Sequence, residues 1–161
     1  MLKSIKKISL LLIILNFSSN TFSEYLKEMK LLKVIDGDTI HSEYKGNLYK
    51  IRLLEIDAPE TDQPHGLDSK NYLKKLLNGG TVDTYISGKD RYGRYLARLY
   101  LKSNDINKKM VETGNAWVYE RYSSDESFYN LQISAKEKRL GLWSADNPVK
   151  PWEWRKLRKK K

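Results

Sequence analysis

The sequence TIHSEYKGNLYKIRLLEI spans residues 39–56 and carries the pattern of a β-hairpin. Residues 39–44 alternate between polar and apolar side chains, which is typical of a strand with one buried face. Lys45-Gly46-Asn47 has the composition of a tight turn, and a β-rich pattern resumes over residues 48–56. A mostly apolar run at residues 29–35 precedes this stretch, so a β-meander is predicted.

Further strands and helices are expected after the meander. Strands are predicted at residues 81–87 and 95–101, around a polar turn at 88–94, and helices at residues 66–77, 105–113 and 125–140, each followed by a glycine-containing stop signal. Five strands in so short a chain must close or be covered to hide their edges. The predicted fold class is therefore α+β, with a small five-stranded β-barrel of the OB type and about three α-helices.

The composition fits one basic globular domain. The chain has 161 residues, of which 40% are hydrophobic, and 30 Lys and Arg against 20 Asp and Glu give a net charge of +10. It has no cysteine, which excludes a disulfide framework, a thiolate zinc site and a cysteine nucleophile. The positive charge favours a polyanionic partner, such as nucleic acid, an anionic membrane surface or a phosphorylated ligand.

The N-terminus has the form of a signal peptide. Lys3, Lys6 and Lys7 precede the apolar run ISLLLIIL at residues 8–15, and small polar residues follow. The run is shorter than the roughly 20 residues of a membrane span. Cleavage after Ser23 is predicted; the alternative is an uncleaved N-terminal anchor. Cleavage removes three lysines and no acid, so +7 remains on residues 24–161, and a secreted or periplasmic protein is expected.

The mature chain divides into a domain at residues 24–149 and a basic tail at residues 150–161. The tail has Trp152 and Trp154 beside several Lys and Arg residues, and it is expected to be a solvated extension that contacts nucleic acid or the cell envelope. It is too short for an amphipathic helix of much membrane affinity, so no stable membrane insertion is expected after cleavage.

Acidic residues cluster at two points of the meander. Asp36 and Asp38 are two positions apart, so on an extended segment both carboxylates would point to the same side. Asp57 ends the third strand, and the hairpin pairing could bring it near Asp38. Oxygen ligands without His or Cys suit Ca²⁺ or Mg²⁺. The alternative for Asp36-Gly37-Asp38 is a tight turn with solvated acids.

Arginines and tyrosines form the second set of candidates. Arg52 lies inside an apolar strand, where an unpaired charge is costly, so it is expected either to bind an anion or to pair with an acid. The turn KDRYGRY at residues 89–95 can present guanidinium groups to phosphates and rings to bases. The alternative for this turn is an ordinary basic hairpin loop.

The motifs taken together resemble the staphylococcal nuclease (thermonuclease) family. They are DGDT at 36–39, RLL at 52–54, DAPET at 57–61, DRYGR at 90–94 and GLW at 141–143, and the resemblance spans about residues 31–154. It implies an OB-type barrel with helices. It also implies Ca²⁺-dependent hydrolysis of DNA and RNA that leaves 3′-phosphate ends, by a protein expected to be a monomer.

The resemblance also implies roles for single residues. Asp38 and Asp57 would hold Ca²⁺ through their carboxylates and Ala58 through its backbone carbonyl, while Asp36 would be outer-sphere. Glu60 would be the general base, Arg52 and Arg94 would bind phosphate, and Tyr92 and Tyr119 would lie near the nucleotide. The loop after Thr61 is shorter than in the best-known member. A domain that binds nucleic acid without cleaving it is the alternative, and retention of the full residue set argues for the enzyme.

Overall fold

The computed structural model describes residues 23–159, so residues 1–22 of the predicted signal peptide lie outside the described range. The strands are β1 (Glu24–Val34), β2 (Thr39–Tyr44), β3 (Asn47–Leu53), β4 (Ile56–Asp57), β5 (Thr81–Lys89), β6 (Tyr95–Leu101), β7 (Asn104–Asp105) and β8 (Trp117–Val118). The helices are α1 (Gly66–Leu77), α2 (Ile106–Glu112), α3 (Glu126–Glu137), a 3₁₀ helix η1 (Gly141–Ser144) and α4 (Pro151–Arg158).

Five of these strands form a closed barrel. The sheet order is β3-β2-β1-β5-β6-β7, and a parallel pairing of β3 with β6 joins the two sides. Closure removes the free edges that five strands would otherwise expose. The predicted OB-type α+β fold is confirmed, and the described residues hold four α-helices where about three were predicted.

The long strand β1 contributes to both sides of the barrel. Its first half pairs with β5 and its second half with β2, and the register shifts between Leu26 and Met29. Glu28 has a positive φ of 55° at this shift. A bulge increases the local bend of a strand, which lets one strand turn between two partners. The predicted strand began only at Met29, because the polar residues before it hide the pairing with β5.

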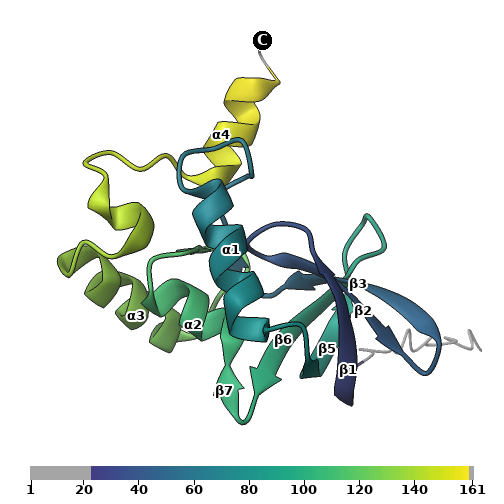
Figure 1. Ribbon diagram of the computed structural model, residues 1–161. Coiled ribbons are helices and arrows are strands. Elements are labelled where there is room, and N and C mark those ends of the chain that lie inside the picture. Colours follow the sequence, from purple (N-terminus) through teal and green to yellow (C-terminus); the bar gives the residue numbers. More distant parts are fainter. Residues whose placement is uncertain (1–22, 160–161) are drawn as a thin grey trace, which may run out of the picture.

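Apolar side chains fill the barrel and the space beneath the helices. Met29, Ile40, Ile51, Ile86 and Leu99 are all 0% exposed. Figure 1 shows α1 lying against the barrel, with α2 and α3 beside each other next to it. A second cluster, formed by Trp117, Ala135, Leu142 and Trp143 with Trp152 packed against it, holds the C-terminal part of the chain to the domain.

The basic tail is not the free extension that was expected, because its first residues pack against the domain, although residues 156–158 are exposed to solvent. They form α4, which begins with the buried Pro151 and projects beyond the start of α1 (Figure 1). Trp152 packs edge-on against Trp117, with ring centroids 6.1 Å apart. Proline suits the first position of a helix, and burial of the indole offsets the cost of ordering so short a helix. Within residues 23–159, no helix is long and apolar enough to cross a bilayer.

Candidate active site

The turn between β1 and β2 supplies the first buried acid. The backbone N–H of Asp38 donates to Oδ1 of Asp36 over 3.0 Å, so residues 36–38 bend, and the expected extended segment is wrong here. Asp38 is nevertheless buried, at 5% exposure. Its carboxylate accepts from the Thr39 hydroxyl at 3.1 Å and from the N–H of Ala58 at 2.6 Å. The alternative interpretation, a tight turn with solvated acids, is therefore right about the turn of the backbone. It is wrong about Asp38, because this acid is buried.

Arg52 joins the acids that the sequence predicted to meet. Its Nη2 lies 3.0 Å from Oδ2 of Asp38 and 2.8 Å from Oδ1 of Asp57. Its Nη1 donates to the carbonyls of Leu53 at 2.6 Å and Ile56 at 2.8 Å. The predicted proximity of Asp38 and Asp57 is confirmed by this shared partner, and Arg52 pairs with acids at the edge of the core.

Short backbone contacts position Asp57 and Glu60. Asp57 pairs with Trp117 across β4 and β8 and is 1% exposed. The N–H of Gln63 donates to the Glu60 carbonyl at 2.8 Å, and the Gln63 side chain accepts from the Glu60 N–H at 3.2 Å. A Cβ at Gly66 would lie 1.7 Å from the Glu60 carbonyl oxygen, so glycine is needed for α1 to start this close. The Glu60 side chain is thus presented from a fixed loop.

Arg155 of α4 enters the same site, although the sequence analysis gave it no role. Its Nη2 lies 2.7 Å from Oδ2 of Asp57, and its Nη1 lies 2.7 Å from Oε1 of Glu60. The Arg155 side chain is 38% exposed, whereas the Asp57 side chain is 1% exposed. Four predicted residues, Asp38, Arg52, Asp57 and Glu60, therefore form one cluster, with Arg155 as a fifth member.

The cluster concentrates more negative charge than its arginines offset. Burial raises the pKa of Asp57, and the nearby charge of Asp38 raises it further, although Arg155 and Arg52 act in the opposite direction. Burial and the charge of Asp38 also raise the pKa of Asp36 to about 7. Crowded carboxylates of this kind favour the binding of an additional cation.

The oxygen donors of this cluster suit a hard cation, but the cluster supplies few side-chain ligands for it. No group of three or more His, Cys, Asp or Glu side chains is arranged as a metal site in the described part of the chain. Asp38 and Asp57 offer carboxylate oxygens, and the backbone of Ala58 is held next to Asp38 by its N–H, which donates to Oδ2 of Asp38 at 2.6 Å. Ca²⁺ takes six to eight oxygen ligands, so waters or substrate oxygens would have to complete its shell. By donor chemistry these residues fit Ca²⁺.

Arg94 and Tyr92 lie on the β5–β6 loop and do not contact the cluster. Asp90 holds Arg94 through Nε at 2.8 Å and also accepts the N–H groups of Tyr92 and Arg94. Burial alone would raise the pKa of Asp90, but these hydrogen bonds outweigh it and lower the pKa. Tyr92 is 69% exposed, with the Arg91 guanidinium 4.8 Å from its ring centroid. The loop and α4 both rise above the barrel in Figure 1.

Tyr119, predicted to lie near the nucleotide, packs against the C-terminal helix. Its ring stacks on Trp152, with centroids 5.3 Å apart and an interplanar angle of 20°. Tyr122, which is 59% exposed, meets the edge of Tyr119 at 4.9 Å. Among residues 23–159, Tyr119 forms no side-chain hydrogen bond to the carboxylates of the cluster, and its ring instead packs against Trp152 of α4.

Sequence reasoning missed Arg155, Gln63 and Trp152. The signal for α4 was present, since Pro151 suits a helix start and Trp152 and Trp154 are apolar anchors among charges. No comparable signal marked Gln63, whose side chain also donates to the Val149 carbonyl at 2.6 Å. This bond ties the Glu60 loop to the segment that leads into α4.

Known proteins with similar sequences point to one family. The family described as "Staphylococcal nuclease homologue" matches residues 50–145, a range that includes Arg52, Asp57, Glu60 and Arg94 but neither Asp38 nor Arg155. An uncharacterized endonuclease of Haemophilus influenzae is 43% identical over 131 residues, which cover 81% of this chain and 74% of that protein. An uncharacterized endonuclease of Escherichia coli is 42% identical over 127 residues, which cover 78% of this chain and 83% of that protein.

Plant proteins match over a shorter range. The staphylococcal-like nuclease CAN1 of Arabidopsis thaliana is 36% identical over 108 residues, which cover 67% of this chain and 33% of the plant protein. The two bacterial relatives are similar over most of their length, and the family match covers more than half of this chain. Together with the closed barrel and the clustered site residues, these similarities show that the chain belongs to the staphylococcal nuclease family.

Proposed function

We propose that this nuclease hydrolyses the phosphodiester bonds of both DNA and RNA with Ca²⁺ as cofactor and leaves 3′-phosphate ends. The observation that supports this most is the cluster in which Arg52 pairs with Asp38 and Asp57, and Arg155 joins Asp57 to Glu60. The crowded buried acids account for a cation requirement, and their oxygen donors favour Ca²⁺ or Mg²⁺ over softer metals.

Charge neutralisation is the first requirement of the reaction. A phosphodiester is anionic and repels a nucleophile, and bound Ca²⁺ would offset charge on its oxygens. Asp38, Asp57 and the carbonyl of Ala58 would hold the ion. Arg52 uses Nη1 for two carbonyls and Nη2 for two carboxylates, so a phosphate oxygen bound by Nη2 takes the place of a carboxylate. Arginine suits this exchange because its fork matches phosphate as well as carboxylate.

Glu60 is the group suited to handle the proton of the attacking water. Its side chain is 29% exposed, unlike that of Asp57, so water has access to it. A carboxylate in this place can orient or deprotonate water, which contributes about a hundredfold to ten-thousandfold. Attack in line with the leaving 5′ oxygen leaves the phosphate on the 3′ side.

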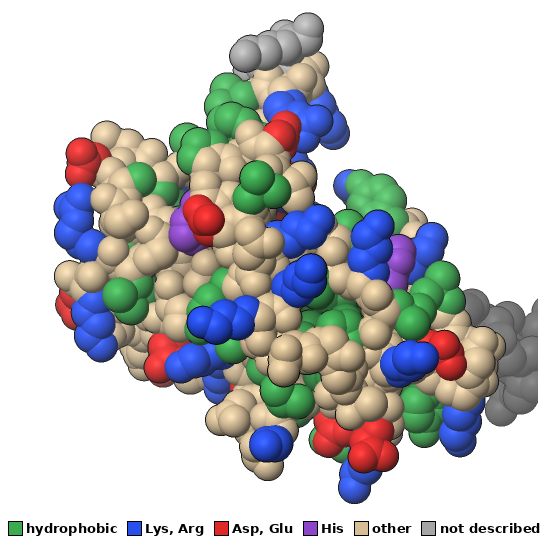
Figure 2. Space-filling model, in the orientation of Figure 1, with side chains coloured by type: hydrophobic (Ala, Val, Ile, Leu, Met, Phe, Trp, Pro, Cys, Tyr) green, Lys and Arg blue, Asp and Glu red, His purple; other side chains and the backbone are tan. Residues whose placement is uncertain are grey.

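The β5–β6 loop and the basic surface would hold the substrate. Only Nε of the Arg94 side chain donates to a protein group in the described residues, so its terminal amino groups are available to a phosphate. The exposed ring of Tyr92 can stack on a base, which does not require a particular sugar. Figure 2 shows Lys and Arg side chains on α4 and on the surface below it, and these supply non-specific attraction to a polyanion.

Digestion of plasmid DNA and of RNA tests the proposal. Parent protein and Glu60→Gln are compared in Ca²⁺, in Mg²⁺ and in chelator, and product ends are identified by their need for a phosphatase before ligation. We expect Ca²⁺-dependent cleavage of both substrates by the parent alone, with 3′-phosphate ends. Binding of oligonucleotides without cleavage in any divalent ion would replace this proposal with a non-catalytic nucleic-acid-binding domain.

We further propose that residues 1–23 direct export and that the exported chain is a monomer with its N-terminus at Glu24. The lysines before the short apolar run and the small residues after it support the export part of this proposal. N-terminal sequencing and gel filtration of exported protein test it. Recovery of a membrane-integrated chain that starts at Met1 would contradict it.

A further inference from the structure

Arg155 occupies the acids to which a cation would bind. Both carboxylate oxygens of Asp57 accept from it, Oδ2 at 2.7 Å and Oδ1 at 3.2 Å, and Oε1 of Glu60 accepts at 2.7 Å. Asp57 is nearly inaccessible to solvent, so its charge depends on such partners. Arg155 and Asp57 are 98 residues apart in the chain, so the contact depends on where α4 is docked.

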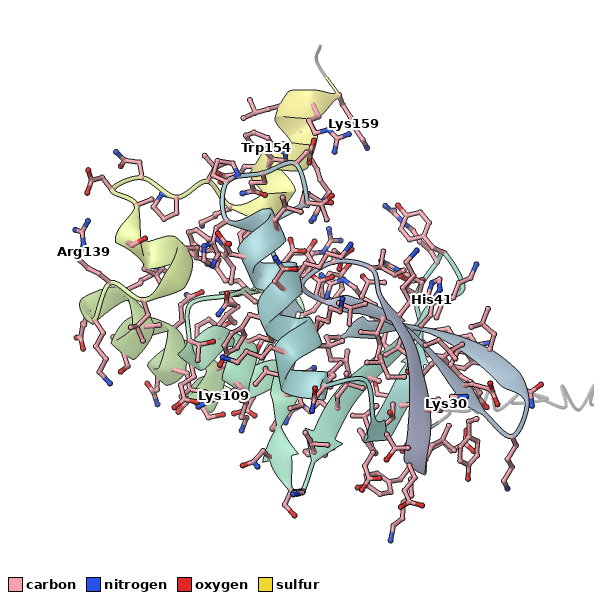
Figure 3. The ribbon with its side chains drawn as sticks, in the orientation of Figure 1. Lys30, His41, Lys109, Arg139, Trp154 and Lys159 are labelled. Carbon is pink, nitrogen blue, oxygen red and sulfur yellow. The ribbon has the colours of Figure 1, made fainter. Side chains whose placement is uncertain are left out.

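Several anchors fix α4 in the orientation that points Arg155 at the site. Trp152 stacks on Tyr119 at its first turn, and Pro151 is buried there. Arg158 Nη1 lies 3.1 Å from a carboxylate oxygen of Asp62. Figure 3 shows Trp154 on α4 beside the loop that precedes α1, and its indole N–H donates to Asp62 at 3.4 Å. The Arg155 guanidinium is therefore held at the site by the packing of the helix.

We infer that Arg155 is a resident counter-ion of the metal site: it holds Asp57 and Glu60 in the metal-free protein, and a divalent cation competes with it for Asp57. This inference rests on the proposed function, because it takes Asp57 as a cation ligand. Oδ2 of Asp57 has Arg155 as its only hydrogen-bond donor within residues 23–159. A cation on that oxygen thus meets Arg155 directly, both sterically and through like-charge repulsion.

The competition has a reciprocal consequence. If Arg155 weakens cation binding, then a bound cation must weaken the Arg155 contact by the same factor. Metal binding and the docking of the Arg155 side chain are therefore linked, and the link can be measured from either side without reference to nuclease activity.

Calorimetric titration of Ca²⁺ without substrate tests the inference. Arg155→Met keeps the alkyl stem and removes the guanidinium. Lys156→Met is the matched control, because Lys156 is exposed on the same helix and pairs with no carboxylate among the described residues. We expect Arg155→Met to bind Ca²⁺ about fivefold more tightly than the parent, which corresponds to the roughly 1 kcal/mol of a partly exposed ion pair. Lys156→Met should match the parent.

The outcomes separate this inference from the proposed function. Equal or weaker Ca²⁺ affinity in Arg155→Met overturns the inference and leaves the nuclease proposal standing. Absence of Ca²⁺ binding in both parent and variant overturns the Ca²⁺ part of the proposed function and the competition with it. Ca²⁺ binding by Arg155→Met but not by the parent supports the inference, because Arg155 would then exclude the cation completely.

A measurement on the unaltered protein keeps the test valid if Arg155→Met does not fold. The Nη–Hη resonances of the arginine side chains, whose Nη atoms make the Arg155 contacts, are followed by NMR as Ca²⁺ is added, with Arg155 assigned from Arg155→Lys. We expect the Arg155 resonance to shift and to exchange faster with solvent as Ca²⁺ saturates the site. An Arg155 resonance that keeps its position and protection at saturating Ca²⁺ overturns the inference.

Discussion

Gly37 packs so closely against Ser69 that a Cβ added at Gly37 would lie 2.0 Å from the Ser69 hydroxyl oxygen. The same Cβ would lie 2.6 Å from Cβ of Ala58. The Asp36–Asp38 turn, α1 and the side chain of Ala58 therefore meet at a point with no room for a further side chain. The hydroxyl of Ser69 is held in turn by the carbonyl of Asn115 at 2.6 Å. At the same point the N–H of Ala58 donates to the Asp38 carboxylate at 2.6 Å, so the close packing at Gly37 lies next to the acid of the site.

Replacement of Gly37 by Ala should destabilise the fold. The added methyl meets two fully packed neighbours, and overpacking of this kind costs about 1–3 kcal/mol. Urea unfolding measures the change. Gly80→Ala is the control, because a Cβ there meets nothing nearer than 3.9 Å. A Gly37→Ala protein as stable as the Gly80→Ala protein would show that α1 can move away from the turn at little cost.

Replacement of Glu60 by Gln should separate binding from turnover. Gln keeps the length and a hydrogen-bonding oxygen for Arg155, but it loses the basicity that the proposed role needs. We expect single-turnover cleavage to fall by about a hundredfold to ten-thousandfold, with oligonucleotide affinity within about threefold of the parent. Cleavage by Glu60→Gln at the parent rate would show that Glu60 takes no part in the proton transfer.

Replacement of Asp57 by Asn should act on the cation. The amide preserves shape and leaves Arg52 and Arg155 with an acceptor, but it removes the charge that attracts Ca²⁺. The Ca²⁺ concentration for half-maximal cleavage should rise by at least about tenfold, and saturating Ca²⁺ should restore part of the rate. The Ca²⁺ dependence of Asp146→Asn should stay near that of the parent, because Asp146 is 86% exposed and pairs with Arg139 rather than with α4 or the cluster. An unchanged Ca²⁺ requirement in Asp57→Asn would exclude Asp57 as a ligand.

Local patterns predicted the elements that depend on local chemistry. The hairpin alternation gave β2, with its bounds Thr39–Tyr44, and the apolar face with the Asn78-Gly79-Gly80 stop gave α1, Gly66–Leu77. Asn78 adopts the left-handed conformation and caps that helix. The meeting of Asp38 and Asp57 was predicted correctly, and the hairpin contributes by pairing Thr39, next to Asp38, with Arg52. The expectation that Asp57 ends the third strand is wrong, because β3 ends at Leu53 and Asp57 lies in the short strand β4, which pairs with β8.

The contacts that the sequence did not predict depend on packing between residues far apart in the chain. Arg155 meets Asp57 only because Trp152 docks on Tyr119 and Trp117, and no periodicity in a short Lys- and Arg-rich tail encodes such a contact. Polar residues at the start of β1 concealed its pairing with β5 in the same way. Arg94 was expected at the phosphate, whereas here it pairs with Asp90 in its own loop, an interaction that sequence spacing alone does not distinguish from ligand binding.

The β5–β6 loop should contribute to substrate affinity through two separable interactions. Tyr92→Ala should weaken oligonucleotide binding by about 1–3 kcal/mol with little change in the slope of log Kd against log salt concentration, because stacking releases no counterions. Arg94→Ala should reduce that slope by about one unit. Affinities measured with an uncleavable oligonucleotide at several salt concentrations test both. Equal slope changes in the two variants would mean that Tyr92 acts by positioning Arg94 or Arg91.

Asp125 should make the fold sensitive to acid. It caps α3 by accepting from the N–H of Ser127 at 3.0 Å and from its hydroxyl at 2.6 Å, and Arg98 and Lys108 lie 3.2 and 3.3 Å away. The Ser127 hydroxyl is the largest cause of a strongly lowered pKa, with further contributions from the backbone N–H and the two cations. A carboxyl whose pKa is lowered by folding stabilises the native state above its unfolded pKa of about 3.9. That contribution is lost as the pH falls from there towards the lowered folded value.

Asp125→Asn isolates this contribution, because Asn still caps a helix but carries no charge. At pH 7 the parent should be more stable than Asp125→Asn by about 1–2 kcal/mol, and the difference should shrink steadily between about pH 4 and pH 2. Urea unfolding of both proteins at each pH measures this difference in unfolding free energy. The contributions of the other titrating groups are the same in both proteins and cancel in the difference. Asp146→Asn is the control: its carboxylate is 86% exposed, so its removal should change stability by less than about 0.5 kcal/mol at every pH. A parent-to-Asp125→Asn difference that stays constant to pH 2 would show that the cap stabilises α3 by hydrogen-bond geometry alone and that the charge contributes nothing.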